Sequence, residues 1–384
     1  MSQPRSQYKN ILCVRADNMG DVLMSAPAMR ALKQTFQCRI TLLTSKMGAL
    51  IAPFVPEVDD TLVCDIPWVK AVEAQDGKAA LQLVQQIQAG KFDCAVIFNV
   101  YSQSALPAAT LLYMAGVPVR LAYSRENPYG LLTHWVPDQE PYQLIRHQVE
   151  RDLALVAYIG AATRDEKLAI TYSKECLLRT QQKVLKKTGV GPGNRYLVIH
   201  PGVSELKREY PADKWATAVA GLHNATGLPV LISGSVADSP LAEKIIAEAG
   251  VGCYSLAGHL TIEEWIALIA GAALVVSVNT ATVHVAAAVQ TPVVVLYALT
   301  NPQHTPWLVQ NTILPYSVKK DMKSRNEVIR YVDEEMFAEE VPLPTPDKII
   351  TAVQALLRQP TSGTVSRSIL FRYTAPATGF ARLN

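Results

Sequence analysis

A short polar segment, S-V-N-T-A-T-V-H (277–284), separates two apolar runs that are typical of buried strands. If the first strand ends near Asn279 and a helix begins there, the free N–H groups and positive dipole end of that helix would bind a phosphate. Thr280 and Thr282 would add hydroxyl donors, and the small Ala281 would let a diphosphate approach the backbone. Alternatively, Asn279 or Thr280 only caps the helix, which both residue types do well.

Other polar residues also stand directly after apolar runs. In the first half of the chain they are Asp17, Asn18, Gly20 and Asp21. In the second half they are Ser204, Lys207, Ser233 and Gly234. The charge of Lys207 could face the same anion as segment 277–284, although a lone lysine after a strand is usually only solvated. Asp21 could take the proton of an attacking hydroxyl as a general base, or it could be an acid that the dipole favours in the first turn of a helix.

The elements that must position these residues are strands and helices that alternate along the chain in two series. Segments 10–15, 39–44 and 92–99 are apolar runs of the first series, and the second series begins near Tyr196. Such alternation predicts open α/β sheets covered by helices on both faces. Because ligands bind beyond the carboxyl ends of strands in these sheets, we expect the site in a crevice between two sheets.

We place the domain boundary between two helical segments, 145–160 and 174–189. The predicted organisation is an N-terminal domain over 1–175, a C-terminal domain over 176–345, a C-terminal helix over 346–359 and a flexible basic tail over 360–384. The segment G-V-G-P-G-N (189–194) is similar to part of a dinucleotide fingerprint, but it precedes a strand and opens no helix. We therefore interpret it as a turn.

Composition excludes several classes of protein. The three arginines of the tail account for the net charge of +3, so the rest of the chain is balanced, which argues against a dedicated nucleic-acid binder. Six scattered cysteines without a C-x-x-C pair indicate a reducing cytoplasm and no metal cluster. The chain begins without the apolar region of a signal peptide and has no run of about 18 apolar residues. The tail could contact an anionic membrane surface peripherally; the alternative is a merely disordered tail.

Three sequence blocks together resemble glycosyltransferase family 9, the ADP-heptose heptosyltransferases of lipopolysaccharide core synthesis. The blocks are R-A-D-N-M-G-D-V-L-M-S-A-P-A-M-R-A-L-K (15–33), H-P-G-V-S-E-L-K-R-E-Y-P-A-D-K-W (200–215) and V-V-S-V-N-T-A-T-V-H followed by V-A-A-A-V-Q-T-P-V-V-V-L-Y-A-L-T-N-P (275–302), in the family's order. The resemblance implies a GT-B fold, in which two Rossmann-like α/β domains face each other across a cleft. The acceptor would bind the first domain and the nucleotide sugar the second.

The resemblance also implies roles for matching residues. Asp21 matches the proposed catalytic base, and Lys207 matches the lysine near the donor phosphates. Thr280 and His284 match the threonine and histidine of the third block. Leu260 stands where the family sets an apolar residue against adenine.

The chain departs from the family pattern at Asn279 and Ala281, where the family has Asp and Gly. Asn279 can both donate and accept hydrogen bonds without a charge, so we expect it to lie in the donor pocket and to select the sugar. On the acceptor side we place Asp17, Asn18, Gly20 and Arg120.

The residue types suggest how the reaction would proceed. The chain contains no D-x-D motif, so a helix N-terminus and Lys207 would stabilise the leaving diphosphate without a metal or other cofactor. One base and no second carboxylate nucleophile indicate single displacement with inversion. We therefore predict an inverting transferase that moves a heptose or related sugar from an ADP-sugar, or another nucleotide diphosphate sugar, to a saccharide or lipid-linked saccharide such as the lipopolysaccharide core. A GT-B nucleotide-sugar epimerase and a non-catalytic nucleotide-sugar-binding protein remain alternatives.

Overall fold

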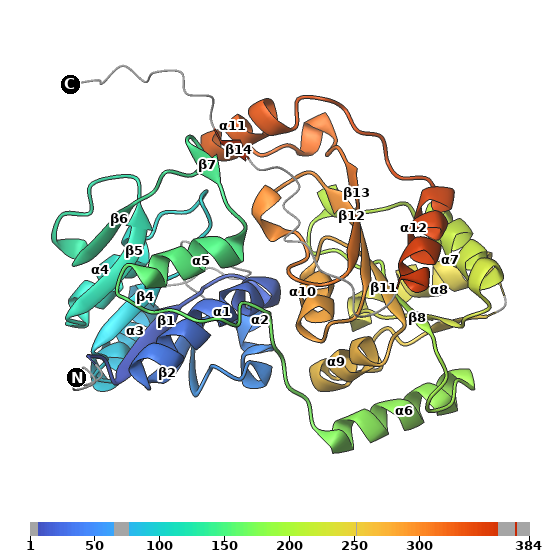
Figure 1. The fold of residues 1–384 in the computed structure, drawn as a ribbon, viewed down its shortest axis with the longest axis horizontal. Helices are drawn as coiled ribbons and strands as arrows, with labels where there is room; N and C mark the ends of the chain where they lie inside the picture. The colour runs from blue at the N-terminus through green and yellow to red at the C-terminus, as the bar shows by residue number, and fades with distance from the viewer. Residues whose placement is uncertain (1–6, 65–76, 251, 360–372, 375–384) are drawn as a thin grey trace.

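The computed structural model describes residues 7–64, 77–250, 252–359 and 373–374 of the chain. Two six-stranded sheets dominate it, one in each half (Figure 1). Both sheets have parallel neighbouring strands and the same topology, with the first strand of each series beside the second and the fourth. This is the doubly wound arrangement that the alternating pattern predicts.

The first sheet has the order β3-β2-β1-β4-β5-β6. Its strands are β1 (Asn10–Val14), β2 (Arg39–Thr44), β3 (Asp60–Val63), β4 (Cys94–Ile97), β5 (Val119–Ser124) and β6 (His134–Pro137). Helices α1 (Met19–Phe36) and α5 (Gln148–Ala157) share an apolar cluster with one face. Helices α3 (Gly77–Ala89) and α4 (Leu106–Met114) share a cluster with the other, and the short α2 (Lys46–Ala49) follows β2.

The second sheet has the order β10-β9-β8-β11-β12-β13. Its strands are β8 (Leu197–His200), β9 (Val230–Ile232), β10 (Cys253–Ser255), β11 (Leu274–Val278), β12 (Val293–Ala298) and β13 (Asn311–Tyr316). Helices α7 (Ala212–Thr226), α8 (Ser239–Ala249) and α12 (Pro346–Arg358) pack on the outer face. Helices α9 (Ile262–Ala270) and α10 (Ala281–Ala288) cover the face toward the first half of the molecule (Figure 1). One apolar cluster runs across the junction from α1 to α10.

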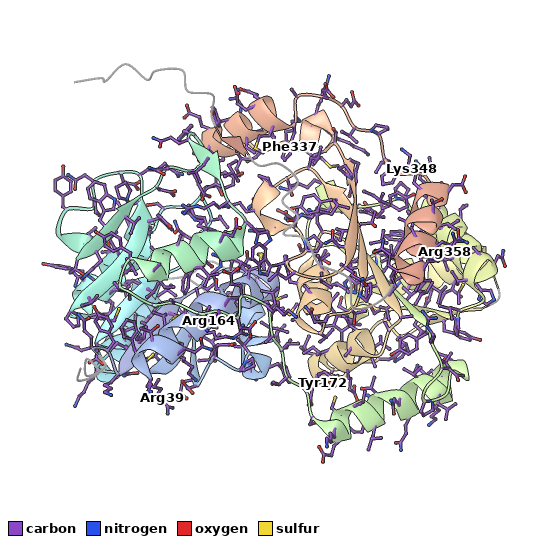
Figure 2. The ribbon with its side chains drawn as sticks, viewed as in Figure 1. Arg39, Arg164, Tyr172, Phe337, Lys348 and Arg358 are labelled. Atoms are coloured by element: carbon purple, nitrogen blue, oxygen red, sulfur yellow. The ribbon has the colours of Figure 1, made fainter. Side chains whose placement is uncertain are left out.

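Segments outside the two sheets connect the halves. The chain crosses between them after α5, past Arg164 and Tyr172, which are labelled in Figure 2, and then forms α6 (Lys174–Thr188). Ser173 donates from both its N–H and its hydroxyl to Glu263 (2.9 Å each), which joins the start of α6 to α9. Segment 189–194 continues from the left-handed C-cap Gly189 into a turn, as the sequence predicts.

The C-terminal part returns to both halves. Helix α11 (Glu327–Met336) packs against Tyr101 and Ile145 of the first half, and α12 packs on the second sheet and α7. Of the predicted tail, only Tyr373–Thr374 lie within the described residues, where they form β14 antiparallel to β7 (Leu144–Ile145; Figure 1). None of the described helices is long and apolar enough to cross a bilayer.

Candidate active site

The N-termini of α1 and α10 meet where the two halves touch. Helix α1 follows β1, and α10 follows β11, so both begin at carboxyl ends of central strands. A Cβ atom at Gly20 would lie 2.7 Å from Cδ2 of His284 and 3.5 Å from Cα of Ala281. Only a glycine allows this approach without a shift of the histidine. Gly20, Ala281 and His284, all assigned from the sequence, therefore come together.

Arg15 organises the acidic residues at the start of α1. Its buried guanidinium lies 2.8 Å (Nη2) from Oδ1 of Asp21 and 3.3 Å (Nε) from Oδ2 of Asp17. The N–H of the N-cap residue Asn18 donates to Oδ2 of Asp21 (3.2 Å). Asp21 thus occupies the helix-start position that the alternative interpretation gave it, and it also faces the junction between the halves.

The two carboxyls respond differently to this environment. Burial alone would raise the pKa of Asp21, but Arg15, with help from His304 and the Asn18 N–H, lowers it to about 2. Asp21 is therefore ionised at any physiological pH. Burial raises the pKa of Asp17, and the attraction of Arg15 only partly opposes this. The side-chain amide of Gln103 donates to Oδ1 of Asp17 (2.7 Å).

Two histidines from the second half face Asp21. Nε2 of His304 lies 3.7 Å from Oδ1 of Asp21, and the rings of His304 and His284 meet edge to face at 6.4 Å. Burial lowers the pKa of His284 to about 3 and that of His304 to about 4, so both are neutral at pH 7. His284 is buried, and its Nδ1 has no hydrogen-bond partner in the part of the chain that the structure describes. By contrast, 23% of the His304 side chain is exposed and can reach a ligand.

The segment that carries His304 is held by the first half of the molecule. The side-chain amide of Gln303 donates to Oε2 of Glu140 (2.5 Å), and Nε2 of His147 lies 2.9 Å from the Thr305 carbonyl oxygen. The His147 ring also stacks on Trp307 at 4.4 Å. The relative position of His304 and Asp21 therefore depends on how the two halves dock.

Lys207 and Arg208 supply positive charge beyond the carboxyl end of β8, where the sequence analysis predicts the donor site. Both lie on a short 3-10 turn, Leu206–Arg208, and both face Glu205, at 3.5 Å (Nζ) and 3.0 Å (Nη2). Nη1 of Arg208 donates to the Asn279 carbonyl oxygen (3.0 Å) at the end of β11. The Nε atom of Arg208 is buried and has no hydrogen-bond partner among the described residues.

A cavity of about 150 Å³ opens beside these cations. It is lined from the second half by Lys207, Arg208, His304 and Lys323, and from the first half by Tyr101 and Ser102, among others. Three of its lining side chains are cationic and one, Asp333, is a carboxyl, so the excess of positive charge and the position between the halves suit an anionic group of a ligand.

The remaining predicted donor residues form a row along the carboxyl edge of the second sheet. Ser233 is buried and lies 3.0 Å (Oγ) from Nδ1 of His200, at the ends of β9 and β8. Gly234 is a close-packing position, because a Cβ there would lie 2.7 Å from Cβ of Asp238. Ser204 is exposed in the turn after β8, and Leu260 is half-buried before α9. Thr280 is the N-cap of α10, and its hydroxyl lies 3.3 Å from that of Thr282.

Asn279 has a role that neither sequence interpretation anticipates. Its Oδ1 accepts from the Ala298 N–H, and its Nδ2 donates to the Ala298 carbonyl oxygen, both at 3.2 Å. A longer contact joins Nδ2 to Oγ1 of Thr300 (3.4 Å). The side-chain amide thus extends the β11–β12 ladder by one step, as a backbone peptide would. Both amide hydrogens are used within the protein, and the helix cap is Thr280 instead.

Arg120 does not join the other predicted acceptor-side residues. It lies near the start of β5, away from the carboxyl ends of the strands. Its guanidinium donates to the carbonyl oxygens of Leu131 (2.7 Å) and Gly130 (2.9 Å) and also to that of Val117. The structure therefore corrects this assignment, because the arginine ties backbone segments together and does not face the cleft.

Sequence reasoning missed Arg208 and His304. Arg208 directly follows the assigned Lys207 within block 200–215, whereas His304 lies two residues beyond the end of block 275–302. What the sequence did not reveal is that one guanidinium nitrogen would be buried unpaired and that the histidine would meet Asp21.

Comparison with known proteins places this arrangement in a family. The family model for glycosyltransferase family 9 (heptosyltransferase) matches residues 80–331. The chain belongs to glycosyltransferase family 9. It is 26% identical to a lipopolysaccharide heptosyltransferase 3 of Escherichia coli over 90% of this chain and 98% of that protein. It is also 26% identical to a lipooligosaccharide heptosyltransferase 2 of Haemophilus influenzae over 77% of this chain and 85% of that one.

Solved structures show the same fold. A glycosyl transferase family 9 structure from Veillonella parvula superposes with a TM-score of 0.72 at 16% identity, covering 92% of this chain and 99% of that one. The E. coli ADP-heptose lps heptosyltransferase II gives 0.67 at 22% identity, covering 91% and 98%. The predicted GT-B fold and the predicted family are thus confirmed, and this family 9 protein is a glycosyltransferase.

Proposed function

We propose that this glycosyltransferase moves a heptose, or a closely related sugar, from an ADP-sugar to a saccharide acceptor of the lipopolysaccharide core. The curated relatives that match most of the chain carry the names of lipopolysaccharide and lipooligosaccharide heptosyltransferases. The observation that carries the proposal is the position of ionised Asp21 at the junction of the halves, 3.7 Å from His304, a residue that lines the cation-rich cavity. The reaction would take place in the cytoplasm.

On the donor side, fixed positive groups would stabilise the charge that develops on the diphosphate as it leaves. The N-terminus of α10 supplies free N–H groups and the positive end of its dipole. Lys207 and Arg208 line the cavity and add cations. Removal of one preorganised donor of this kind typically costs about a hundredfold to a thousandfold in rate. On this proposal the protein itself supplies the positive charge and the reaction uses no metal.

On the acceptor side, Asp21 would accept the proton of the attacking hydroxyl. A carboxylate with a pKa of about 2 is a weak base, so it cannot remove the proton from a free alcohol to any useful extent. The hydroxyl becomes acidic once its oxygen has largely bonded to the anomeric carbon, and a weak base suffices at that late stage. Arg15 keeps Asp21 ionised and oriented, and neutral His304 borders the same space. A single base on one face of the donor fits direct displacement with inversion.

The proposal is tested by supplying ADP-heptose with and without a deacylated core oligosaccharide, while ADP release and product mass are measured. The expected result is a product one heptose heavier, formed only with acceptor, with inverted anomeric configuration. Conversion of the donor without acceptor would instead indicate an epimerase or hydrolase. Binding of the donor without turnover, over a panel of acceptors, would indicate a nucleotide-sugar-binding protein.

A further inference from the structure

Asp333 is an acid that the proposed mechanism does not use, and it lines the cation-rich cavity of about 150 Å³. It lies on α11, which spans the junction between β7 of the first half and β13 of the second (Figure 1). The preceding residue, Val332, is fully buried in a cluster that includes Tyr101 and Ile145 of the first half. The position of Asp333 therefore depends on the docking of the two halves, as that of His304 does.

The carboxylate of Asp333 has no partner in the part of the chain that the structure describes. The residue is only 8% exposed. Within the described residues, no side chain or backbone N–H donates a hydrogen bond to the carboxylate, and none forms an ion pair with it. Burial raises the pKa of Asp333, and the charges of Lys323 and Lys207 only partly oppose this. Because buried charges are normally paired, this carboxylate is suited to a ligand that brings hydrogen-bond donors into the cavity.

The charges that line the cavity divide it into two kinds of surface. Among the described lining residues, Asp333 is the only acid, and Lys207, Arg208 and Lys323 are cations. The cations suit a diphosphate, whereas a carboxylate repels one at short range. A carboxylate only accepts hydrogen bonds, and its two oxygens offer about four lone-pair sites. Its natural partner is an uncharged group with several donors, such as the hydroxyls of a sugar, and a nucleotide sugar carries a diphosphate and a sugar side by side.

We infer that Asp333 is a specificity-determining residue for the donor: its carboxylate accepts hydrogen bonds from hydroxyls of the sugar to be transferred, while the cations of the cavity hold the diphosphate. The inference rests on the proposed function, because it assigns a contact to the sugar of the donor. Hydrogen bonds to an ionised group are about twice as strong as neutral ones. Asp333 therefore favours the intact nucleotide sugar over the free nucleotide that remains after transfer.

The test compares the affinity of a nucleotide sugar with that of its free nucleotide, because the ratio reports contacts to the sugar. Calorimetry gives dissociation constants for ADP-heptose and ADP, GDP-mannose and GDP, and UDP-glucose and UDP. The pair whose sugar form binds the wild type most tightly is then measured with the variants at pH 8. Asp333→Asn keeps the shape of the side chain and removes its charge. The affinity ratio should fall at least fivefold, while the free nucleotide binds as tightly as before or more tightly. Asp333→Ala, which removes both acceptor oxygens, should lower the ratio at least as far.

Glu334→Gln is the matched control. Glu334 follows Asp333 on α11, but its side chain is 67% exposed and lies 3.4 Å from Nη2 of Arg330. The variant removes the same charge outside the cavity lining, so the ratio should remain that of the wild type. An unchanged ratio in Asp333→Asn would overturn the inference. So would an equal change in both affinities, because Asp333 would then be only a counter-ion of Lys207 and Lys323.

The transfer assay separates this inference from the proposed function. If heptose is transferred to the core oligosaccharide and Asp333→Asn leaves the ratio unchanged, the proposed function stands and the role of Asp333 is wrong. If the ratio falls but no heptose is transferred to any acceptor, Asp333 contacts the sugar and the proposed reaction is wrong. A wild type that binds no nucleotide sugar more tightly than its free nucleotide would overturn the inference as well.

Discussion

The substitution Asn279→Asp separates a structural role from a role in sugar selection. The change keeps the shape of the side chain but replaces its NH₂ group with an oxygen. Two donated hydrogen bonds, to the Ala298 carbonyl oxygen and to Thr300, are lost. The new oxygen then faces a carbonyl oxygen across 3.2 Å, the distance that the donated bond now spans. The bond accepted from the Ala298 N–H survives.

The cost follows from burial. Ala298 is fully buried, and a buried polar group left unpaired costs about 1–3 kcal/mol. The long contact with Thr300 adds about 0.5 kcal/mol, at the lower limit for a hydrogen bond. We therefore expect the free energy of unfolding at pH 8 to fall by about 1.5–3.5 kcal/mol, which lowers the Tm by about 3–14 °C for a domain of roughly 150–250 residues.

The effect should depend on pH with a defined sign. A protonated carboxyl can donate to the Ala298 carbonyl oxygen, so the introduced group has a higher pKa in the folded state than in the unfolded state. Its penalty is present at high pH and disappears as the pH falls below about 4, the ordinary pKa of an aspartate. Denaturant unfolding at pH 8 and pH 5 measures this, with a smaller difference from the wild type expected at pH 5.

Asn326→Asp is the matched control. Asn326 caps α11, and its Oδ1 accepts from the N–H groups of Val328 and Ile329. An aspartate can accept the same bonds and is as good a cap, so this variant should be as stable as the wild type. The reasoning is refuted if Asn279→Asp is no less stable than this control. If it is stable and the relative affinities for ADP-heptose and two other nucleotide sugars change several-fold, Asn279 selects the sugar as the sequence suggested.

Four further predictions concern the site, its support and the tail. Asp21→Asn should lower the transfer rate about a hundredfold to ten-thousandfold, while the affinity for ADP-heptose, measured by calorimetry, should be retained. A variant that keeps more than a third of the wild-type rate would contradict the role of Asp21 as base. Arg208→Ala should lower kcat/KM about a hundredfold, and Arg208→Lys should fail to restore it because lysine lacks the hydrogen-bond donors of a guanidinium. Lys207→Ala should weaken the binding of the nucleotide sugar as well as lower the rate. Burial raises the pKa of Asp152 to about 6 against the opposing effect of Arg15, so wild-type stability should fall as the pH rises from about 4 to 6. Asp152→Asn should therefore gain about 2 kcal/mol of stability relative to the wild type between pH 4 and pH 7 in denaturant titrations. A difference that does not change with pH would show that Asp152 is ionised throughout this range. If the tail is inert, the full chain should co-sediment with anionic vesicles no more than a chain of residues 1–359 does. Greater, salt-sensitive binding of the full chain, at about 1 kcal/mol per basic residue, would indicate that the tail contacts the membrane.

The sequence by itself was enough to predict the architecture and the segments in which the candidate site lies. Runs of buried strand residues and helical spacing are local patterns, and each is enough to predict burial and element type without knowledge of neighbours. Because ligands in α/β sheets bind at carboxyl ends of strands, the position of Asp21, Lys207 and Thr280 directly after strands already pointed to the cleft. The family resemblance added the expected reaction and the pairing of domains.

Only the tertiary structure decided what several polar side chains contact. Asn279 pairs with Ala298, which lies 19 residues further along the chain on a neighbouring strand. His304 approaches Asp21 only because the two halves dock, and Arg120 binds carbonyl oxygens that a different loop path would have placed elsewhere. The type of a polar residue determines which hydrogen bonds its side chain can make, but the partners of that side chain depend on which distant segments fold beside it. For that reason the nitrogen of Arg208 that has no partner among the described residues could be found only in the folded molecule.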